Sequence, residues 1–330
     1  MVTEKAVKNK LKELDAFLLE TYRKTYVSER KNEPDYDRKF VKCIKEAIRS
    51  MNSLIREATE NISVERGKGA IPKLTLEQRV RLILIKQLID KSNRMMEGML
   101  NLFLMLLDID VSYKTIERFY SHQDVWLALC NLGILILKKK EIEEIDSSGD
   151  ASGYALTITE HYRSYAQRLK EKSKKSEGKK KKFVYQFALM DLETKMYVAM
   201  GVSLKSEKEA YNRALKSLNK SGIRLNSIRL DRYYSNASDV NRFKNSTIYF
   251  IPKKNVTLQN SLYWNSRLEE FVKNTFEYLQ EYFKRNNSES GFGADKKMMG
   301  WKIGQKREDR IETAIFCKMI WRNLFRMNRD

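Results

Sequence analysis

The hydrophobic pattern of the chain changes at Glu141, and this change sets the limits on its fold. Before Glu141, apolar residues recur at the spacing of α-helices over residues 3–30 and 36–60. After it, short runs rich in aliphatic and aromatic residues alternate with helical segments. Only 3 prolines occur in 330 residues, so long uninterrupted helices are permitted. We therefore expect a helical N-terminal part followed by a mixed α/β part.

Residues 71–140 carry the signals of a compact helical module. Thr75 and Gln78 fit a capping box, which predicts a helix from there to about Asp90. A second helix is expected over Asn93–Leu107, and a third begins at Ser112. Three helices joined by short turns are typical of a helix-turn-helix, and an ordinary helical bundle is the alternative.

The charge of the chain indicates a polyanionic partner. Lys and Arg number 64 against 43 Asp and Glu, a net charge of +21, which favours nucleic acid or, as the alternative, an anionic membrane surface. The third expected helix carries Lys114 and Arg118, which would read DNA. The stretch Arg163–Lys182 holds ten basic and two acidic residues and would bind phosphates; it ends in Lys179, Lys180, Lys181 and Lys182.

The second half of the chain predicts an RNase H-like fold, a mixed five-stranded sheet flanked by helices. Strands are expected at Glu141–Ser147, Phe183–Met190, Lys195–Leu204, Ser227–Asp231 and Ser246–Ile251. Helices are expected at Ser206–Lys220, Ala237–Lys244, Leu262–Asn286 and Arg307–Met327. A hairpin turn at Asp191–Thr194 joins the second and third strands. The order of these elements is that of an RNase H-like domain.

Two carboxylates are expected to meet at the ends of neighbouring strands. Asp146 closes the first predicted strand and Asp231 closes the fourth, and these strands are adjacent in this topology. A divalent metal ion relieves the repulsion of two close carboxylates, and hard oxygen ligands select magnesium or manganese. Asp150 competes with Asp146 for this role, but it follows Gly149 in an expected loop, so Asp146 is preferred.

A further set of polar residues recurs at helical spacing near the C-terminus. Tyr282, Arg285 and Glu289 share one face of a helix, and Lys296 lies two turns further on if the helix continues. In such a set the carboxylate can bind a metal ion, and the phenol, guanidinium and ammonium around it can bind a phosphate beside that ion. A chance charge pattern on a solvated helix is the alternative.

Together these residues resemble the DDE transposases of insertion sequences, and within them the group named for a Tyr-x2-Arg-x3-Glu-x6-Lys signature. The signature is met in full, and Asp146-Ser147-Ser148-Gly149 and Asp231-Arg232-Tyr233-Tyr234 look like the two acid motifs. The resemblance implies that Asp146, Asp231 and Glu289 hold two Mg²⁺ ions, which Mn²⁺ can replace. It also implies that Tyr282 and Arg285 contact the phosphate near the cut and Lys296 the DNA end.

The resemblance further implies the reaction and the partners. Such an enzyme binds terminal inverted repeats, cuts the element's ends and joins the 3′-OH to target DNA, as a homodimer that pairs two ends. Larger relatives insert a β-rich domain between the second Asp and the Glu. Here Asp231 and Glu289 are only 58 positions apart, so such an insertion must be absent or very small. Whether this protein cuts DNA through a hairpin intermediate therefore stays open. An RNase H-like nuclease or resolvase, and a silent transposase-derived DNA-binding protein, are the alternatives.

The remaining expectations concern compartment and domains. The apolar runs are too short to span a bilayer and no signal peptide is recognised, so a soluble protein of the prokaryotic cytoplasm, associated with the nucleoid and without a membrane partner, is expected. With 3 Cys and 2 His far apart, a His/Cys zinc site is excluded. Three regions are expected: 1–70, 71–140 and the catalytic domain 141–330.

Overall fold

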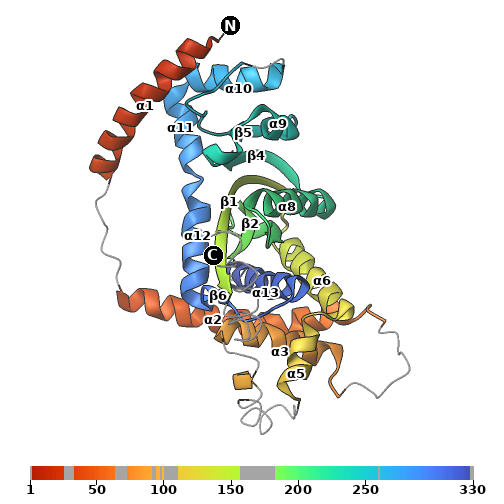
Figure 1. Ribbon diagram of the computed structural model, residues 1–330. Helices are drawn as coiled ribbons and strands as arrows, with labels where there is room; N and C mark the ends of the chain where they lie inside the picture. The colour runs from red at the N-terminus through yellow and green to blue at the C-terminus, as the bar shows by residue number, and fades with distance from the viewer. Residues whose placement is uncertain are drawn as a thin grey trace, which may run out of the picture.

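The N-terminal part is helical, as the apolar spacing predicts. The computed structural model describes residues 2–25, 33–63, 73–90, 94–96, 99, 111–156, 183–258 and 261–327. Within them lie α1 (Glu4–Thr25), α2 (Glu33–Thr59), α3 (Leu76–Ile89), α5 (Tyr113–Phe119) and α6 (Gln123–Lys139) (Figure 1). The last of these was not predicted from the sequence.

Local capping chemistry sets the helix starts. Thr75 and Gln78 form the predicted capping box at the start of α3, and the Ser112 side chain accepts a hydrogen bond from the backbone of Thr115 to cap α5. The middle helix of the expected helix-turn-helix, Asn93–Leu107, lies largely outside the described residues. The helix-turn-helix therefore stays a prediction, although two of its helices are confirmed.

A mixed sheet follows, with strand order β3-β2-β1-β4-β5. The strands are β1 (Glu144–Leu156), β2 (Phe183–Asp191), β3 (Tyr197–Ser203), β4 (Arg224–Leu230), β5 (Thr247–Tyr249) and β6 (Lys302–Ile303). β1, β2 and β3 are antiparallel, whereas β4 and β5 run parallel to β1. The predicted five strands are present, and the unpredicted β6 adds a sixth that pairs with the far end of β1.

Helices cover both faces of this sheet. They are α8 (Glu207–Ser221), α9 (Ala237–Val240), α10 (Leu262–Lys273), α11 (Thr275–Phe283), α12 (Asn286–Met299) and α13 (Glu308–Met327), with the short 3₁₀ turns η1 (Arg232–Tyr234) and η2 (Asn241–Phe243). Phe187 of β2 contacts Tyr211 of α8 with ring centroids 5.1 Å apart, so α8 covers one face. α11 and α12 run one after the other along the other side of the sheet (Figure 1).

The segment predicted as one helix, Leu262–Asn286, is divided. α10 ends and α11 begins at Asn274, whose backbone (φ −117°, ψ 45°) is not helical. α11 in turn ends at Phe283, and a separate helix, α12, begins at Asn286. Tyr282 and Glu289 therefore lie on different helices, with Arg285 at the junction between them.

The C-terminal helix α13 joins the two parts of the molecule. It is buried along most of its length and contacts α2, α3 and α6 as well as β3 and β6. The indole N–H of Trp321 donates to the carbonyl of Leu84 at 2.7 Å, and the Cys43 thiol donates to the carbonyl of Phe325 at 3.2 Å. The N-terminal helices and the sheet thus share one hydrophobic core, and the division into three domains stays a prediction.

No helix in the described ranges is long and apolar enough to cross a membrane.

Candidate active site

The first strand is longer than predicted, and this changes the setting of its acidic residues. β1 begins at Glu144 and continues to Leu156, so Asp146 lies near its start and does not close it. Asp150, expected in a loop, lies within the strand. The residues between these two acids, Ser147, Ser148 and Gly149, are all buried in the sheet.

Small residues are needed there because neighbours approach closely. A Cβ on Gly149 would lie 2.8 Å from side-chain atoms of Leu189, Leu230 and Phe187. On the opposite face, the hydroxyls of Ser148 and Ser288 are hydrogen-bonded at 2.6 Å, which holds α12 against β1. The loop-like composition therefore results from tight packing on both faces of the strand.

The register between β1 and β4 decides which acid faces Asp231. Asp146 pairs with Ser227, and Gly149 pairs with Leu230, the last residue of β4. Asp150 is therefore next to Asp231, whereas Asp146 is four residues away, about 13 Å along the strand. The expectation that Asp146 and Asp231 face each other is wrong, because the register brings Asp150 to that position instead.

Asp146 belongs to a different network. Its carboxylate accepts a hydrogen bond from the Ser227 hydroxyl and lies 3.8 Å from the guanidinium of Arg229. Arg229 is buried and pairs with Glu281 of α11. The Asp146 side chain is 58% exposed, so its charge stays in contact with water. This arrangement ties β1 and β4 to α11.

The Asp150 side chain is much less exposed to water than that of Asp146. Its side chain is 16% exposed, and it lies on the same face of β1 as Ser148, beneath α12, because alternate residues of a strand share a face. Burial raises the pKa of its carboxyl to about 6, and the nearby Glu289 and Asp231 carboxylates raise it too, against the opposing effect of Arg285.

The acidic cluster consists of Asp150, Asp231 and Glu289, and Arg285 pairs with two of these acids, Asp150 and Glu289. Its guanidinium lies 3.4 Å from the Asp150 carboxylate and donates to the Glu289 carboxylate at 2.6 Å. The Arg285 side chain is 14% exposed, whereas that of Glu289 is 53% exposed. Burial is the largest influence on the pKa of Arg285 and lowers it, but Tyr282 and the two carboxylates raise it above its usual value. Arg285 therefore acts as the cation that balances this acidic cluster.

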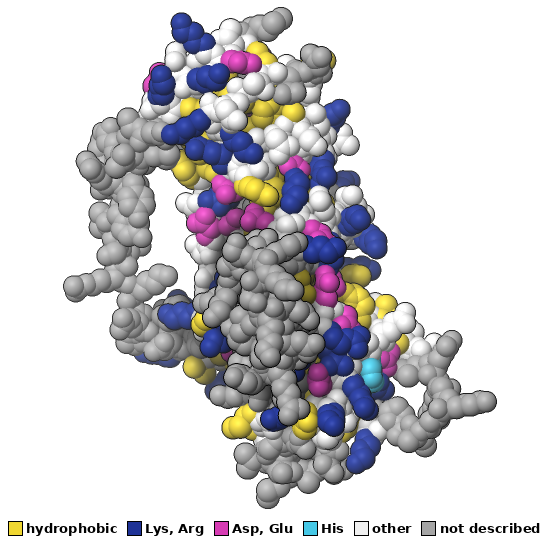
Figure 2. Space-filling view, viewed as in Figure 1, with side chains coloured by type: hydrophobic (Ala, Val, Ile, Leu, Met, Phe, Trp, Pro, Cys, Tyr) yellow, Lys and Arg dark blue, Asp and Glu magenta, His cyan; other side chains and the backbone are white. Residues whose placement is uncertain are grey.

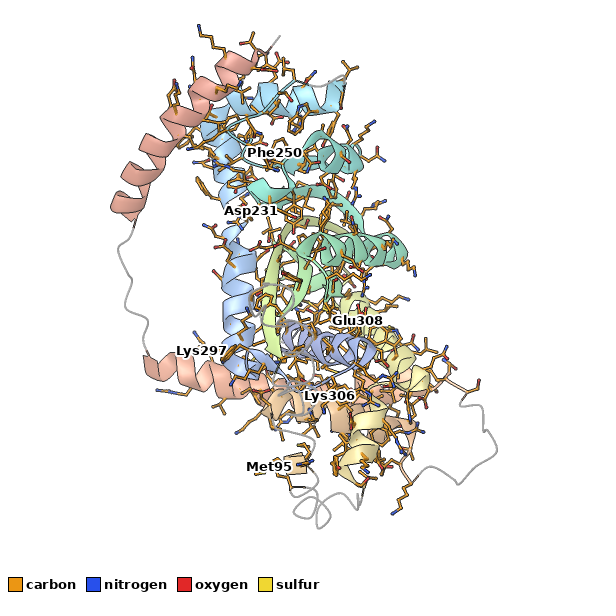
Figure 3. The ribbon with its side chains drawn as sticks, viewed as in Figure 1. Met95, Asp231, Phe250, Lys297, Lys306 and Glu308 are labelled. Atoms are coloured by element: carbon orange, nitrogen blue, oxygen red, sulfur yellow. The ribbon has the colours of Figure 1, made fainter. Side chains whose placement is uncertain are left out.

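Asp231 comes to the cluster from the end of β4. Its carboxylate accepts a hydrogen bond from the backbone of Arg232 at 2.6 Å and so caps η1. Figure 3 places Asp231 at the level where α11 gives way to α12. Acidic side chains gather beside this junction in Figure 2, with Lys and Arg side chains above and below them.

The remaining signature residues differ in exposure. Tyr282 is only 6% exposed, and burial raises the pKa of its phenol. Lys296 lies on α12 with its ammonium 5.3 Å from the ring centre of Tyr154, and burial lowers its pKa. Lys114 and Arg118 are exposed on α5, as a DNA contact would require, and Lys179, Lys180, Lys181 and Lys182 lie outside the described residues.

In this structure the side chains of Asp150, Asp231 and Glu289 are not close enough together to hold a metal ion jointly. Among the described residues, no three of His, Cys, Asp or Glu come close enough to hold a metal ion. The donor set is nonetheless made of hard carboxylate oxygens, and Asp150 is buried beside two further carboxylates. The sequence contains a signal for Asp150, because Asp150-Ala151-Ser152-Gly153 repeats the Asp-x-Ser-Gly pattern that starts at Asp146.

Comparison with known proteins identifies the family. The chain is 44% identical, over 283 residues, to a protein of Archaeoglobus fulgidus described as a probable transposase for the insertion sequence element ISA1214. The match covers 86% of this chain and 84% of the relative. The chain therefore belongs to the transposases of insertion sequences. No family model matches the sequence, and no solved structure matches the chain.

Proposed function

We propose that this protein is a DDE transposase that cuts phosphodiester bonds at the ends of its insertion sequence and joins the freed 3′-OH to target DNA. The observation that carries the proposal is the register of β1 and β4, which sets Asp150 next to Asp231 beneath the helix that bears Glu289. The strand order and the parallel pairing of β4 and β5 with β1 support an RNase H-like framework.

Asp150, Asp231 and Glu289 would hold the metal ions in this proposal, with Asp150 in the role first expected of Asp146. Two Mg²⁺ ions, or Mn²⁺ in their place, fit a set of carboxylate ligands. When bound, such ions activate a water molecule and stabilise the leaving oxygen of a phosphodiester. Burial is the main cause of the raised pKa of Asp150, and the neighbouring Glu289 and Asp231 carboxylates add negative charge that a divalent cation would neutralise, which supports this role.

The chain's own cations would handle the phosphate. Arg285 pairs with Asp150 and Glu289, and its planar guanidinium would turn to a phosphate once a metal balances those carboxylates. Tyr282 is buried next to Arg285, so we expect it to position that guanidinium rather than to contact DNA directly. Lys296 would contact the DNA end.

The DNA-binding surfaces complete the proposal. Lys114 and Arg118, exposed on α5, would read the terminal inverted repeats, and the run that ends in Lys179, Lys180, Lys181 and Lys182 would bind phosphates. Two copies of the chain would act together on the paired ends, since both ends must be cut in concert.

Substitution of the acids tests the proposal. We expect Asp150→Asn and Glu289→Gln to lower Mg²⁺-dependent cleavage of a duplex carrying the terminal repeats more than about 100-fold, while DNA binding is retained. Asp146→Asn is the matched control, because this carboxylate lies on the same strand face but is outside the cluster. The assignment is refuted if Asp150→Asn cleaves like the wild type, or if Asp146→Asn loses as much activity.

The same assay separates the alternatives. Cleavage of branched DNA without strand transfer and without preference for the terminal repeats would indicate a nuclease or resolvase. Binding of the repeats without cleavage in Mg²⁺ or Mn²⁺ would indicate a silent DNA-binding protein.

A further inference from the structure

The helix α2 has a basic face opposite its buried face. The apolar residues that fix α2 in the core include Cys43, Ala47, Met51 and Leu54. The basic face consists of exposed side chains at spacings of four, three, four and seven residues: Arg38, Lys42, Lys45, Arg49 and Arg56. Residues at these spacings lie along one side of a helix. The row is about 27 Å long, since each residue adds about 1.5 Å.

The positive charge of this face is almost uncompensated. The ammonium of Lys42 lies 3.8 Å from the Glu46 carboxylate, and Lys42 is 76% exposed, so this pair neutralises little. Arg38, Lys45 and Arg49 have no ion pair with any described side chain. By contrast, Arg213 on α8 pairs with both Glu209 and Glu308.

The face is also open to a large partner. The first half of α2 projects past α12 in Figure 1. A shallow hollow of about 520 Å³ follows the face and is lined by Arg38, Val41, Lys42, Lys45, Glu46 and Arg49. Val41, which lines the hollow, is 48% exposed, and Ile48, seven residues later on α2, is 40% exposed. Two apolar residues are too few for a helix that lies on a membrane, because the wide apolar face of α2 is already buried against α13, α6 and α3.

We propose that the basic face of α2 binds the phosphate backbone of double-stranded DNA without reading its sequence. A DNA strand offers one phosphate about every 3.4 Å of helix axis, so a row of cations about 27 Å long can follow several of them. Long flexible Lys and Arg side chains are suited to phosphate contacts, which position DNA but carry no sequence information. This inference rests on the proposed function, which makes DNA the substrate, and it adds a surface separate from α5.

The salt dependence of DNA binding measures the contribution of this face. Each neutralised phosphate contributes about 0.9 to the slope of log K against log salt concentration. Replacing Lys42, Lys45 and Arg49 by Gln together should therefore lower the slope by about 2 to 3. The decrease should be equal on a duplex with the terminal repeat and on a scrambled duplex, because phosphate contacts do not depend on sequence.

The experiment uses the full-length protein and fluorescence anisotropy with both duplexes, in EDTA, over a series of KCl concentrations. The matched control replaces Lys216, Lys220 and Lys244 by Gln, which changes the net charge equally on exposed positions of α8 and the turn after η2. We expect the control to keep the wild-type slope. A charge-conserving variant with Lys42→Arg, Lys45→Arg and Arg49→Lys should restore the slope, and circular dichroism verifies the fold of each protein.

Equal slopes for the α2 variant and its control would overturn the proposal. So would a decrease confined to the terminal-repeat duplex, or a lost affinity for phosphatidylglycerol vesicles with unchanged DNA binding. These measurements contain no divalent metal, so they do not depend on catalysis. Absence of cleavage by the wild-type protein in Mg²⁺ would refute the proposed function and leave the result for α2 intact.

Discussion

Asp150→Asn should make the protein more stable while it abolishes cleavage. The Asp150 carboxyl has a pKa of about 6 in the fold against 3.8 without perturbation, mainly because the side chain is buried. At about 1.4 kcal/mol for each pH unit, the ionised carboxylate lowers the free energy of unfolding at pH 7 by up to about 3 kcal/mol. Asparagine has nearly the same shape and carries no charge, so it removes this cost.

The dependence on pH gives the sign of the effect. Between pH 3.8 and about 6 the folded protein binds more protons at Asp150 than the unfolded chain does, so the stability of the wild type falls as the pH rises through this window. The advantage of Asp150→Asn should therefore be full at pH 7 and disappear below about pH 4. Urea unfolding of both proteins at pH 4 and pH 7, in EDTA, measures it.

Asp146→Asn serves as the control in this comparison too. Its carboxylate is 58% exposed and accepts a hydrogen bond from Ser227, so its replacement should bring no gain at pH 7. A loss of stability for Asp150→Asn at pH 7, or a difference that does not change with pH, would refute the reasoning. The Asp150 carboxylate would then be satisfied by Arg285 rather than strained by its neighbours.

Three further predictions concern packing and buried charge. Lys86 is buried against Tyr120, and burial lowers its pKa from 10.5 to about 8. Lys86→Met should therefore raise the free energy of unfolding by up to about 3 kcal/mol at pH 7, measured in urea, and this gain should shrink as the pH rises from 8 toward 10.5. Arg322→Met leaves the Asp295 carboxylate, whose pKa burial already raises, without its guanidinium at 2.9 Å and should cost about 3–5 kcal/mol in the same assay. Replacement of both partners by apolar residues should recover part of that loss. Gly201→Ala would place a methyl group 2.0 Å from a backbone oxygen of α8, and it should lower the Tm in calorimetry by moving α8 away from β3.

Local chemistry in the sequence predicts many element boundaries correctly. The side chains of Thr75 and Ser112 accept backbone hydrogen bonds at their own helix starts, and Gly222 ends α8 in the left-handed conformation (φ 73°). The hairpin turn is likewise closed by the Asp191 carboxylate, which accepts from the backbone of Thr194 at 2.7 Å. These signals work because the interacting residues are three or four positions apart in the chain.

Which acids meet depends on contacts that are distant in sequence, and there the expectation that Asp146 faces Asp231 was wrong. Asp146 and Asp150 both begin an Asp-x-Ser-Gly segment on the same face of one strand. Only the pairing of Gly149 with Leu230, 81 positions later, decides which of them lies next to Asp231. Gly291 is where α12 approaches the sheet, since a Cβ there would lie 2.3 Å from Met190.

The burial of α13 has a consequence for how the protein is made. This helix fills a core whose other walls, α2, α3 and α6, are synthesised some two hundred residues earlier. While the chain is still on the ribosome, the faces of those helices that pack on α13 have no partner, so the native packing of the N-terminal helices has to wait until α13 emerges. Synthesis that stops before Glu308 would leave both the helical part and the sheet without their shared core, and such a product should be recognised by chaperones and proteases rather than persist as a DNA-binding fragment.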